Sequence, residues 1–207
     1  MHALLIAASP SERSRSASLL DAAGRALEDA GVNVRRLSLR DLPADALLHQ
    51  RGGEPRLAAA IAQVAGADAV VLATPIYKAA YSGLLKVFVD LLAQDGLRGK
   101  SVWPLATGGS PAHTFALDHS LRPVLDNLGA QQVLQTVYAL DSQIPFQVGP
   151  HATRIDAAID DRLRAGAARL RAAFDAVDAA RRTAGTDRRS HERAVDSAAI
   201  DALRCSA

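Results

Sequence analysis

The sequence has 207 residues, of which 49 % are hydrophobic and 22 % charged, close to the averages of globular domains. These values exclude a wholly disordered chain, and no apolar run approaches the roughly 20 residues that a membrane span requires. The first residues lack the basic start of a secretory signal, and the one cysteine, Cys205, excludes an intrachain disulfide framework or a thiolate zinc cluster. We therefore expect a cytoplasmic protein with no membrane segment and no metal site.

The charge of the chain is concentrated at its C-terminal end. The formal net charge is +2, and residues 181–207, with six Arg and four acidic residues, account for all of it. A nucleic-acid binder typically has a basic face on its folded part, with aromatic residues interleaved. Aromatic residues are only 4 % of this chain, and it contains no nucleic-acid-binding motif. We expect no nucleic-acid partner.

Apolar runs and helical periodicity alternate along the chain. Five segments have the pattern of strands, in chain order residues 2–8, 32–39, 69–74, 101–107 and 133–140. The intervals between and after them have apolar residues at helical spacing, over residues 16–30, 55–64, 84–92, 113–128 and 154–181. Pro75 is expected to end the third strand. Pro104 lies inside the fourth, although proline favours strand ends and sheet edges because it lacks a backbone donor.

Strands that alternate with helices predict a parallel sheet with right-handed crossovers and helices on both faces. For five strands we predict a doubly wound α/β domain of the flavodoxin-like kind, with strand order 2-1-3-4-5 and a ligand at the carboxyl ends of strands one, three and four. The alternating pattern at residues 32–39 suits a strand at the sheet edge. This domain is expected to occupy residues 1–181, and residues 182–207 to form a charged, disordered tail.

The loop after the first strand contains hydroxyl and guanidinium groups directly before a helix. Ser9, Ser14, Arg15 and Ser16 could therefore bind a phosphate at the helix N-terminus, where unpaired N–H groups and the helix dipole favour an anion. The loop is neither a Walker A motif nor a GxGxxG fingerprint, which favours a single terminal phosphate over a dinucleotide pyrophosphate. A serine-rich turn with an N-cap is the alternative.

Two further loops follow the third and fourth strands. Pro75, Ile76, Tyr77 and Lys78 mix apolar, aromatic and backbone-donor groups in a way that suits a flat heteroaromatic ring. Thr107, Gly108 and Gly109 form the other loop, in which glycine allows the backbone to approach a ring edge closely. In the predicted fold these loops and the serine-rich loop meet at one crevice.

Three stretches together resemble the NAD(P)H-dependent FMN reductases, in particular the alkanesulfonate-assimilation type. They are Ser9-Pro10 with Ser14-Arg15-Ser16, the run Ala73-Thr-Pro-Ile-Tyr-Lys-Ala-Ala-Tyr-Ser-Gly-Leu-Leu-Lys86, and Pro104-Leu-Ala-Thr-Gly-Gly109 followed by Ala112-His113. The resemblance covers roughly residues 3–145. The chain departs from the family pattern at Ala8-Ser9, where Gly-Ser is usual, and at Ser11, where the family often has Arg; Arg13 or Arg15 could supply that charge.

The resemblance implies FMN binding, reduction of FMN by NADPH or NADH, and delivery of the reduced flavin to a partner monooxygenase. It assigns the phosphate to Ser9, Ser14, Arg15 and Ser16 and the flavin ring to Pro75–Lys78 and Thr107–Gly109, with no catalytic acid or base. Lys78 could instead be a solvated loop residue. A quinone, azo or metal-ion reductase with tightly bound FMN and a flavodoxin-like electron carrier are the alternatives. We expect a homodimer or homotetramer, with Tyr81 and residues 87–92 at the interface.

Overall fold

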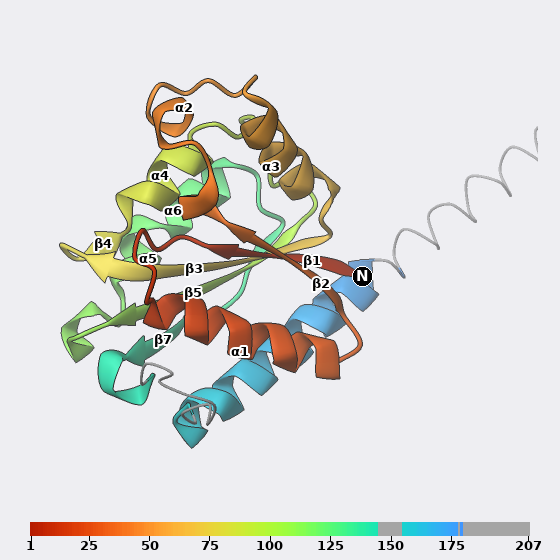
Figure 1. The fold of residues 1–207 in the computed structure, drawn as a ribbon. Coiled ribbons are helices and arrows are strands. Elements are labelled where there is room, and N and C mark those ends of the chain that lie inside the picture. The colour runs from red at the N-terminus through yellow and green to blue at the C-terminus, as the bar shows by residue number, and fades with distance from the viewer. Residues whose placement is uncertain (145–154, 178, 180–207) are drawn as a thin grey trace, which may run out of the picture. The chain divides into compact units, whose positions relative to one another are not determined.

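A parallel sheet forms the centre of the computed structural model, which describes residues 1–144, 155–177 and 179. Its strands are β1 (His2–Ala7), β2 (Asn33–Ser38), β3 (Ala69–Tyr77), β4 (Ala80–Tyr81), β5 (Ser101–Gly108), β6 (Gln132–Val133) and β7 (Val137–Leu140). The order is β2-β1-β3-β5-β6, with β7 also on β5. The short β4 is antiparallel to β3 (Figure 1). The predicted flavodoxin-like fold is therefore confirmed, with a hairpin strand added and the fifth strand divided into β6 and β7.

Helices cover both faces of the sheet (Figure 1). Five of them pack on one face, namely α2 (Ala44–Leu48), α3 (Pro55–Gly66), α4 (Gly83–Val89), α5 (Ala116–Ser120) and α6 (Arg122–Asn127). The other face is covered by α1 (Arg15–Asp29) and by a helix that begins at residue 157. Single 3₁₀ turns occupy Leu39–Asp41, Pro111–His113 and Asp141–Gln143.

The strands read as continuous apolar runs because both of their faces are buried. In β1, Leu4 and Ile6 belong to the core under α2–α6, whereas Ala3 and Leu5 belong to the core under α1. By contrast β2, at the sheet edge, buries only one of its six residues, which explains its alternating polar sequence. The expected edge position of this strand is thus confirmed.

The expectation that Pro75 ends the third strand is wrong, because β3 continues to Tyr77. The Ala8 N–H donates to the Ala73 carbonyl (2.9 Å), the last bond between these two strands. Residues two apart in a strand direct their backbone groups to the same side, so Pro75 faces the side where β1 has already ended. Its missing N–H costs no ladder bond, and pairing with β5 continues through Pro75 and Thr107.

Pro104 lies in the interior of the sheet for a similar reason. The Val102 carbonyl accepts a hydrogen bond from the Leu134 N–H (2.8 Å), and Pro104, two residues further on, faces the same side. There β6 has ended and β7 has not begun, so no strand donor or acceptor stands opposite the proline nitrogen. The gap between β6 and β7 therefore allows a proline inside the sheet, as a sheet edge normally does.

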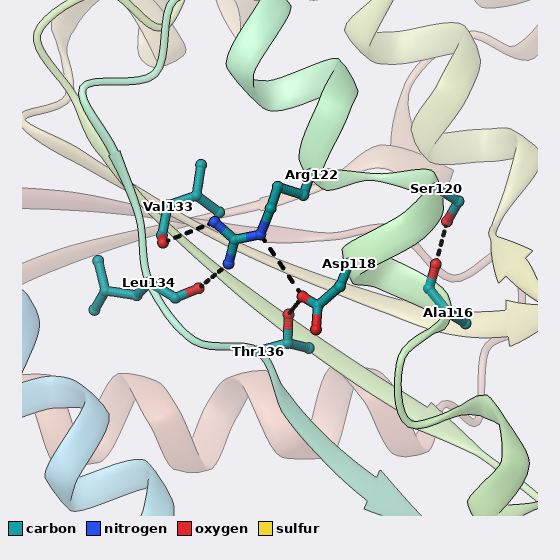
Figure 2. Close-up of polar contacts among 7 residues, drawn as sticks. All are labelled: Ala116, Asp118, Ser120, Arg122, Val133, Leu134 and Thr136. Atoms are coloured by element: carbon teal, nitrogen blue, oxygen red, sulfur yellow. Dashed lines mark hydrogen bonds and ion pairs between the residues drawn. The ribbon is translucent and has the colours of Figure 1, made fainter.

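An arginine from the helical layer occupies the interruption between β6 and β7 (Figure 2). Arg122 donates to the carbonyls of Val133 (3.2 Å) and Leu134 (3.4 Å), and its Nε lies 3.8 Å from a carboxylate oxygen of Asp118. The same Asp118 oxygen accepts a hydrogen bond from the Thr136 hydroxyl (3.2 Å). Backbone acceptors released by the broken strand are thereby satisfied.

The remaining helices differ from the prediction at their boundaries. The segment expected over residues 113–128 is a 3₁₀ turn followed by α5 and α6, and the helix expected from residue 154 begins at residue 157. The chain divides into two units, residues 1–171 and 172–207; in the second, residues 172–177 and 179 are helical. The predicted boundary after residue 181 and the predicted disordered tail lie outside the described residues. Within the described part, no helix has the length and apolar character needed to cross a bilayer.

Candidate functional site

A cleft of about 240 Å³, open to solvent, lies at the carboxyl ends of β1, β3, β5 and β7. Its lining contains ten of the eleven residues that the sequence nominated. These are Ser9, Ser14, Arg15, Ser16, Pro75, Ile76, Tyr77, Thr107, Gly108 and Gly109. Ser11, Arg13 and Asp141 complete the lining. The structure therefore brings the three loops together where a doubly wound sheet places its ligands.

The serine-rich loop ends on the N-terminus of α1. Ser14 is the N-cap, and its hydroxyl accepts a hydrogen bond from the Ala17 N–H (3.2 Å) and lies 3.0 Å from the Ser16 hydroxyl. Ser9 is buried and accepts from the Ser11 N–H (3.2 Å). No acidic residue occupies the first turn of α1, so the positive end of the helix dipole is not neutralised there. The N-cap role and an anion-binding role coexist in this geometry.

Arg15 reaches from α1 to the loop after β7. Its Nε donates to the Ile144 carbonyl (3.1 Å), and its guanidinium Nη1 lies 3.7 Å from a carboxylate oxygen of Asp141. The exposed fractions of the two charged side chains are 30 % and 44 %, so solvent screens this ion pair. An anionic ligand in the cleft would compete with Asp141 for the guanidinium.

The second loop is a hairpin between β3 and β4. Tyr77 stands opposite Ala80, so Lys78 and Ala79 form a two-residue turn, and both have positive φ (49° and 61°), as in a type I′ turn. Non-glycine residues in this conformation each cost about 1–3 kcal/mol. Tyr77 is 46 % exposed and lines the cleft. Lys78 is exposed in the turn and is the one nominated residue outside the cleft lining.

The third loop continues from the end of β5. Thr107 is buried, and Gly108, its neighbour in the cleft wall, pairs with Leu140 of β7. A Cβ built on Gly109 would stand 3.8 Å from the Asp141 carboxylate, so the third loop and the loop after β7 lie side by side. The absence of side chains here exposes backbone groups to the cleft.

A buried polar network joins the first and second loops beneath the cleft. The Ser82 hydroxyl donates to the Ala8 carbonyl (2.5 Å) and accepts from the Leu85 N–H (3.2 Å), which makes Ser82 the N-cap of α4. The Ser82 N–H donates to the Thr74 hydroxyl (2.9 Å). Thr74 and Ser82 are almost completely buried. These bonds fix the ends of β1 and β3 relative to the start of α4.

Three lining residues are not among the eleven predicted site residues, although the sequence offers Arg13 as an alternative to Arg15 for the phosphate charge. Asp141 directly follows β7, so the rule that ligands gather at the carboxyl ends of parallel strands could have identified it. Ser11 and Arg13 lie within the serine-rich loop itself, but spacing alone does not show which hydroxyl or guanidinium faces the cleft. Among the described residues, no group of three His, Cys, Asp or Glu is arranged to hold a metal ion.

The chemistry of the lining suits binding rather than acid–base catalysis. Hydroxyl and guanidinium groups come from the serine-rich loop, and apolar, aromatic and glycine residues come from the loops after β3 and β5. Of the described residues that line the cleft, none is a His, Cys or Lys, and the carboxylate of Asp141 lies 3.7 Å from the Arg15 guanidinium, so the lining lacks the usual pair of a nucleophile and a His or Lys base. Such a cleft suits a ligand that has an anionic tail and a flat ring and that carries its own reactivity.

Comparisons with known proteins point to one family. A family model described as NADPH-dependent FMN reductase matches residues 1–144. A protein of Pseudomonas putida strain KT2440, named FMN reductase (NADPH), is 44 % identical over 158 residues, which cover 76 % of this chain and 80 % of its own. A protein of the same name from Escherichia coli strain K12 is 43 % identical over 166 residues, covering 77 % and 87 %. The solved apo form of an NADH:FMN oxidoreductase matches with a TM-score of 0.76 at 36 % identity, covering 83 % of this chain and 89 % of that one.

Proposed function

This chain belongs to the NADPH-dependent FMN reductase family, and from that premise we propose that it oxidises NAD(P)H and reduces FMN in the cleft described above. FMN supplies the two-electron chemistry when bound, so the protein needs no acid or base of its own. The cleft carries this proposal, because its lining combines groups that suit an anion with groups that suit a flat ring, and its described residues include no His, Cys or Lys.

The residues of the cleft suit the parts of FMN. Ser9, Ser14, Arg15 and Ser16 offer hydroxyl and guanidinium donors for the phosphate, together with the N-terminus of α1. Two further ranges, 75–77 and 107–109, offer apolar contact and backbone groups for the isoalloxazine ring. Asp141 stands between these regions and limits the negative charge that the cleft accepts.

A visible spectrum and a nicotinamide-oxidation assay test the function. We expect a protein that is nearly colourless after purification and that oxidises NADPH only when FMN is added. A bright yellow protein that reduces quinones or azo compounds without added FMN would instead favour the alternative reductase with tightly bound flavin. A protein that neither binds FMN nor oxidises NAD(P)H would contradict the proposal.

The nucleotide donor is proposed to be NADPH, with NADH as the alternative. The two curated relatives at 43–44 % identity are named for NADPH, whereas the solved neighbour at 36 % identity is named for NADH. The ratio of kcat/KM for the two nucleotides at saturating FMN decides between them.

The reduced FMN is proposed to pass to a flavin-dependent monooxygenase of sulfonate assimilation in the cytoplasm. The opening of the cleft to solvent supports this proposal, because a product must leave before a second enzyme uses it. The test combines the reductase with a sulfonate monooxygenase and measures sulfite release. Sulfite that depends on both proteins supports the coupling, and oxidation of NADPH without sulfite release contradicts it.

The chain is further proposed to form a homodimer or homotetramer through the region around α4. Tyr81, Leu84, Val87, Leu91 and Leu92 are only partly buried and pack at the margin of the core. Half-covered apolar side chains at one margin are typical of a surface that a second subunit completes. Light scattering should give a mass of two or four chains, and a monomer near 21.7 kDa at micromolar concentration would contradict this.

A further inference from the structure

Tyr138 lies directly behind the wall of the cleft without lining it. It belongs to β7, pairs with Ala106 of β5 and is 5 % exposed. Its hydroxyl donates a hydrogen bond to the Ser110 carbonyl (2.6 Å), just after the two glycines of the third loop. Burial raises the pKa of the Tyr138 phenol, so the group remains a donor throughout the neutral range.

The phenol also fills the space behind Gly108. A Cβ placed on Gly108 would lie 2.7 Å from the Tyr138 hydroxyl oxygen and 3.5 Å from the Cβ of Ile76. A side chain on Gly108 would therefore collide with the Tyr138 phenol, which passes this residue to reach the carbonyl of Ser110. The phenol blocks movement of the third loop toward Tyr138, and the hydrogen bond to Ser110 opposes movement away from Tyr138.

The backbone of Tyr138 is held from the opposite side of the sheet. Arg162, in the helix that begins at residue 157, donates to the carbonyls of Tyr138 (3.0 Å) and Thr136 (3.4 Å). Hydrogen bonds thus hold both the backbone and the hydroxyl of Tyr138, so the position of the third loop depends on the position of β7.

We propose that Tyr138 is a positioning residue for flavin, which holds residues 108–110 in the conformation that receives the isoalloxazine ring. This inference rests on the proposed function, since it presupposes that the cleft binds a flavin. Because Tyr138 acts on the ring side, its removal should weaken FMN and riboflavin to the same extent. Loss of a phosphate contact would weaken FMN alone.

Tyr138→Phe keeps the ring in the core and removes only the hydroxyl. We expect the Kd of flavin, measured by fluorescence quenching on the flavin-free protein, to rise about 2- to 10-fold for both FMN and riboflavin, the range expected for one neutral hydrogen bond. The absorption spectrum of bound flavin should shift as well, because the ring edge meets a looser backbone. The rise in KM for FMN should exceed the fall in kcat.

Thr136→Val is the matched control. It also removes one buried hydroxyl from the same segment, but the partner of that hydroxyl is Asp118 (Figure 2). Asp118 does not line the cleft. This control should lower thermal stability without changing either Kd. A purely structural role for Tyr138 predicts that both variants melt earlier and that neither changes flavin binding, which would overturn the inference.

Gly108→Ala supplies a second test that does not depend on how well Tyr138→Phe folds. Its methyl group would collide with the Tyr138 hydroxyl, so the single variant should weaken both flavins, and combining it with Tyr138→Phe should recover part of that loss. Strictly additive losses would contradict the proposed contact. If the unmodified chain binds neither flavin, the proposed function itself fails, whereas normal binding with an unaffected Tyr138→Phe refutes the role of Tyr138 alone.

Discussion

Replacement of Arg15 by alanine tests the phosphate side of the cleft most directly. A charge-assisted hydrogen bond contributes about 1.5–3 kcal/mol. In the flavin-free protein the guanidinium already pairs with Asp141 at 3.7 Å, and a screened pair of this kind is worth about 0–1 kcal/mol, which phosphate binding must displace. The net loss in Arg15→Ala is therefore about 0.5–3 kcal/mol, or a roughly 2- to 150-fold weaker FMN affinity.

The assay is titration of flavin fluorescence with both FMN and riboflavin. Arg15→Ala should weaken FMN and leave riboflavin unchanged, and the rate at saturating FMN should change little because the proposed ring-binding residues, 75–77 and 107–109, are unaltered. The variant also loses the bond from Nε to the Ile144 carbonyl, so Tm should fall by a few degrees. Asp141→Asn is the converse variant, in which FMN affinity should rise by up to about fivefold and riboflavin affinity should stay constant.

Equal losses for FMN and riboflavin in Arg15→Ala would refute this reasoning. That outcome, together with a lower Tm, would mean that the loop has only a structural capping role. If Arg15→Ala changes neither flavin, Arg13→Ala becomes the next test, since Arg13 also lines the cleft. If both arginine variants bind the two flavins with unchanged affinity, the phosphate does not bind at this loop.

Three further predictions concern stability. Gly166→Ala should destabilise the protein by about 1–3 kcal/mol, because the new Cβ would lie 2.1 Å from the Trp103 ring. The control Gly66→Ala meets no atom within 4 Å and should be neutral. Thermal unfolding of both variants tests this prediction. Ser82→Ala should cost about 2–3 kcal/mol in urea unfolding, because it removes a helix cap and leaves a buried carbonyl unpaired. The raised pKa of Tyr138 stabilises the fold below about pH 10, and this stabilisation is lost as pH rises through the raised pKa, so Tyr138→Phe should show a smaller alkaline loss of stability.

The fold could be predicted because both faces of most strands are buried. Segments such as residues 2–8 are almost entirely apolar, as expected for strands that are buried on both faces. The alternating polar residues of β2 instead indicate a strand at the sheet edge. The division of the fifth strand could not be predicted in the same way. It depends on Arg122, which supplies donors to carbonyls 11 and 12 residues further along the chain.

Proline shows the limit of local rules in this chain. Pro75 and Pro104 each lack a backbone N–H donor, and the general preference of proline predicts a strand end or a sheet edge at both positions. In the folded chain both prolines face a place where the neighbouring strand is absent, so neither forfeits a ladder bond. The cost of a proline in a sheet is thus decided by strand partners that are far away in sequence.

The hydrogen bonds that hold the loops of the cleft could not be predicted from residue spacing. Three hydrogen bonds tie the loops to other elements, and their partners stand 74, 129 and 28 residues apart: Ser82 to Ala8, Arg15 to Ile144, and Tyr138 to Ser110. The described residues that line the cleft include no His, Cys or Lys, so we propose that the protein contributes to the reaction mainly by placing these loops. The rate and flavin affinity should therefore respond to changes at Ser82 and Tyr138, which do not line the cleft, as well as to changes in its wall.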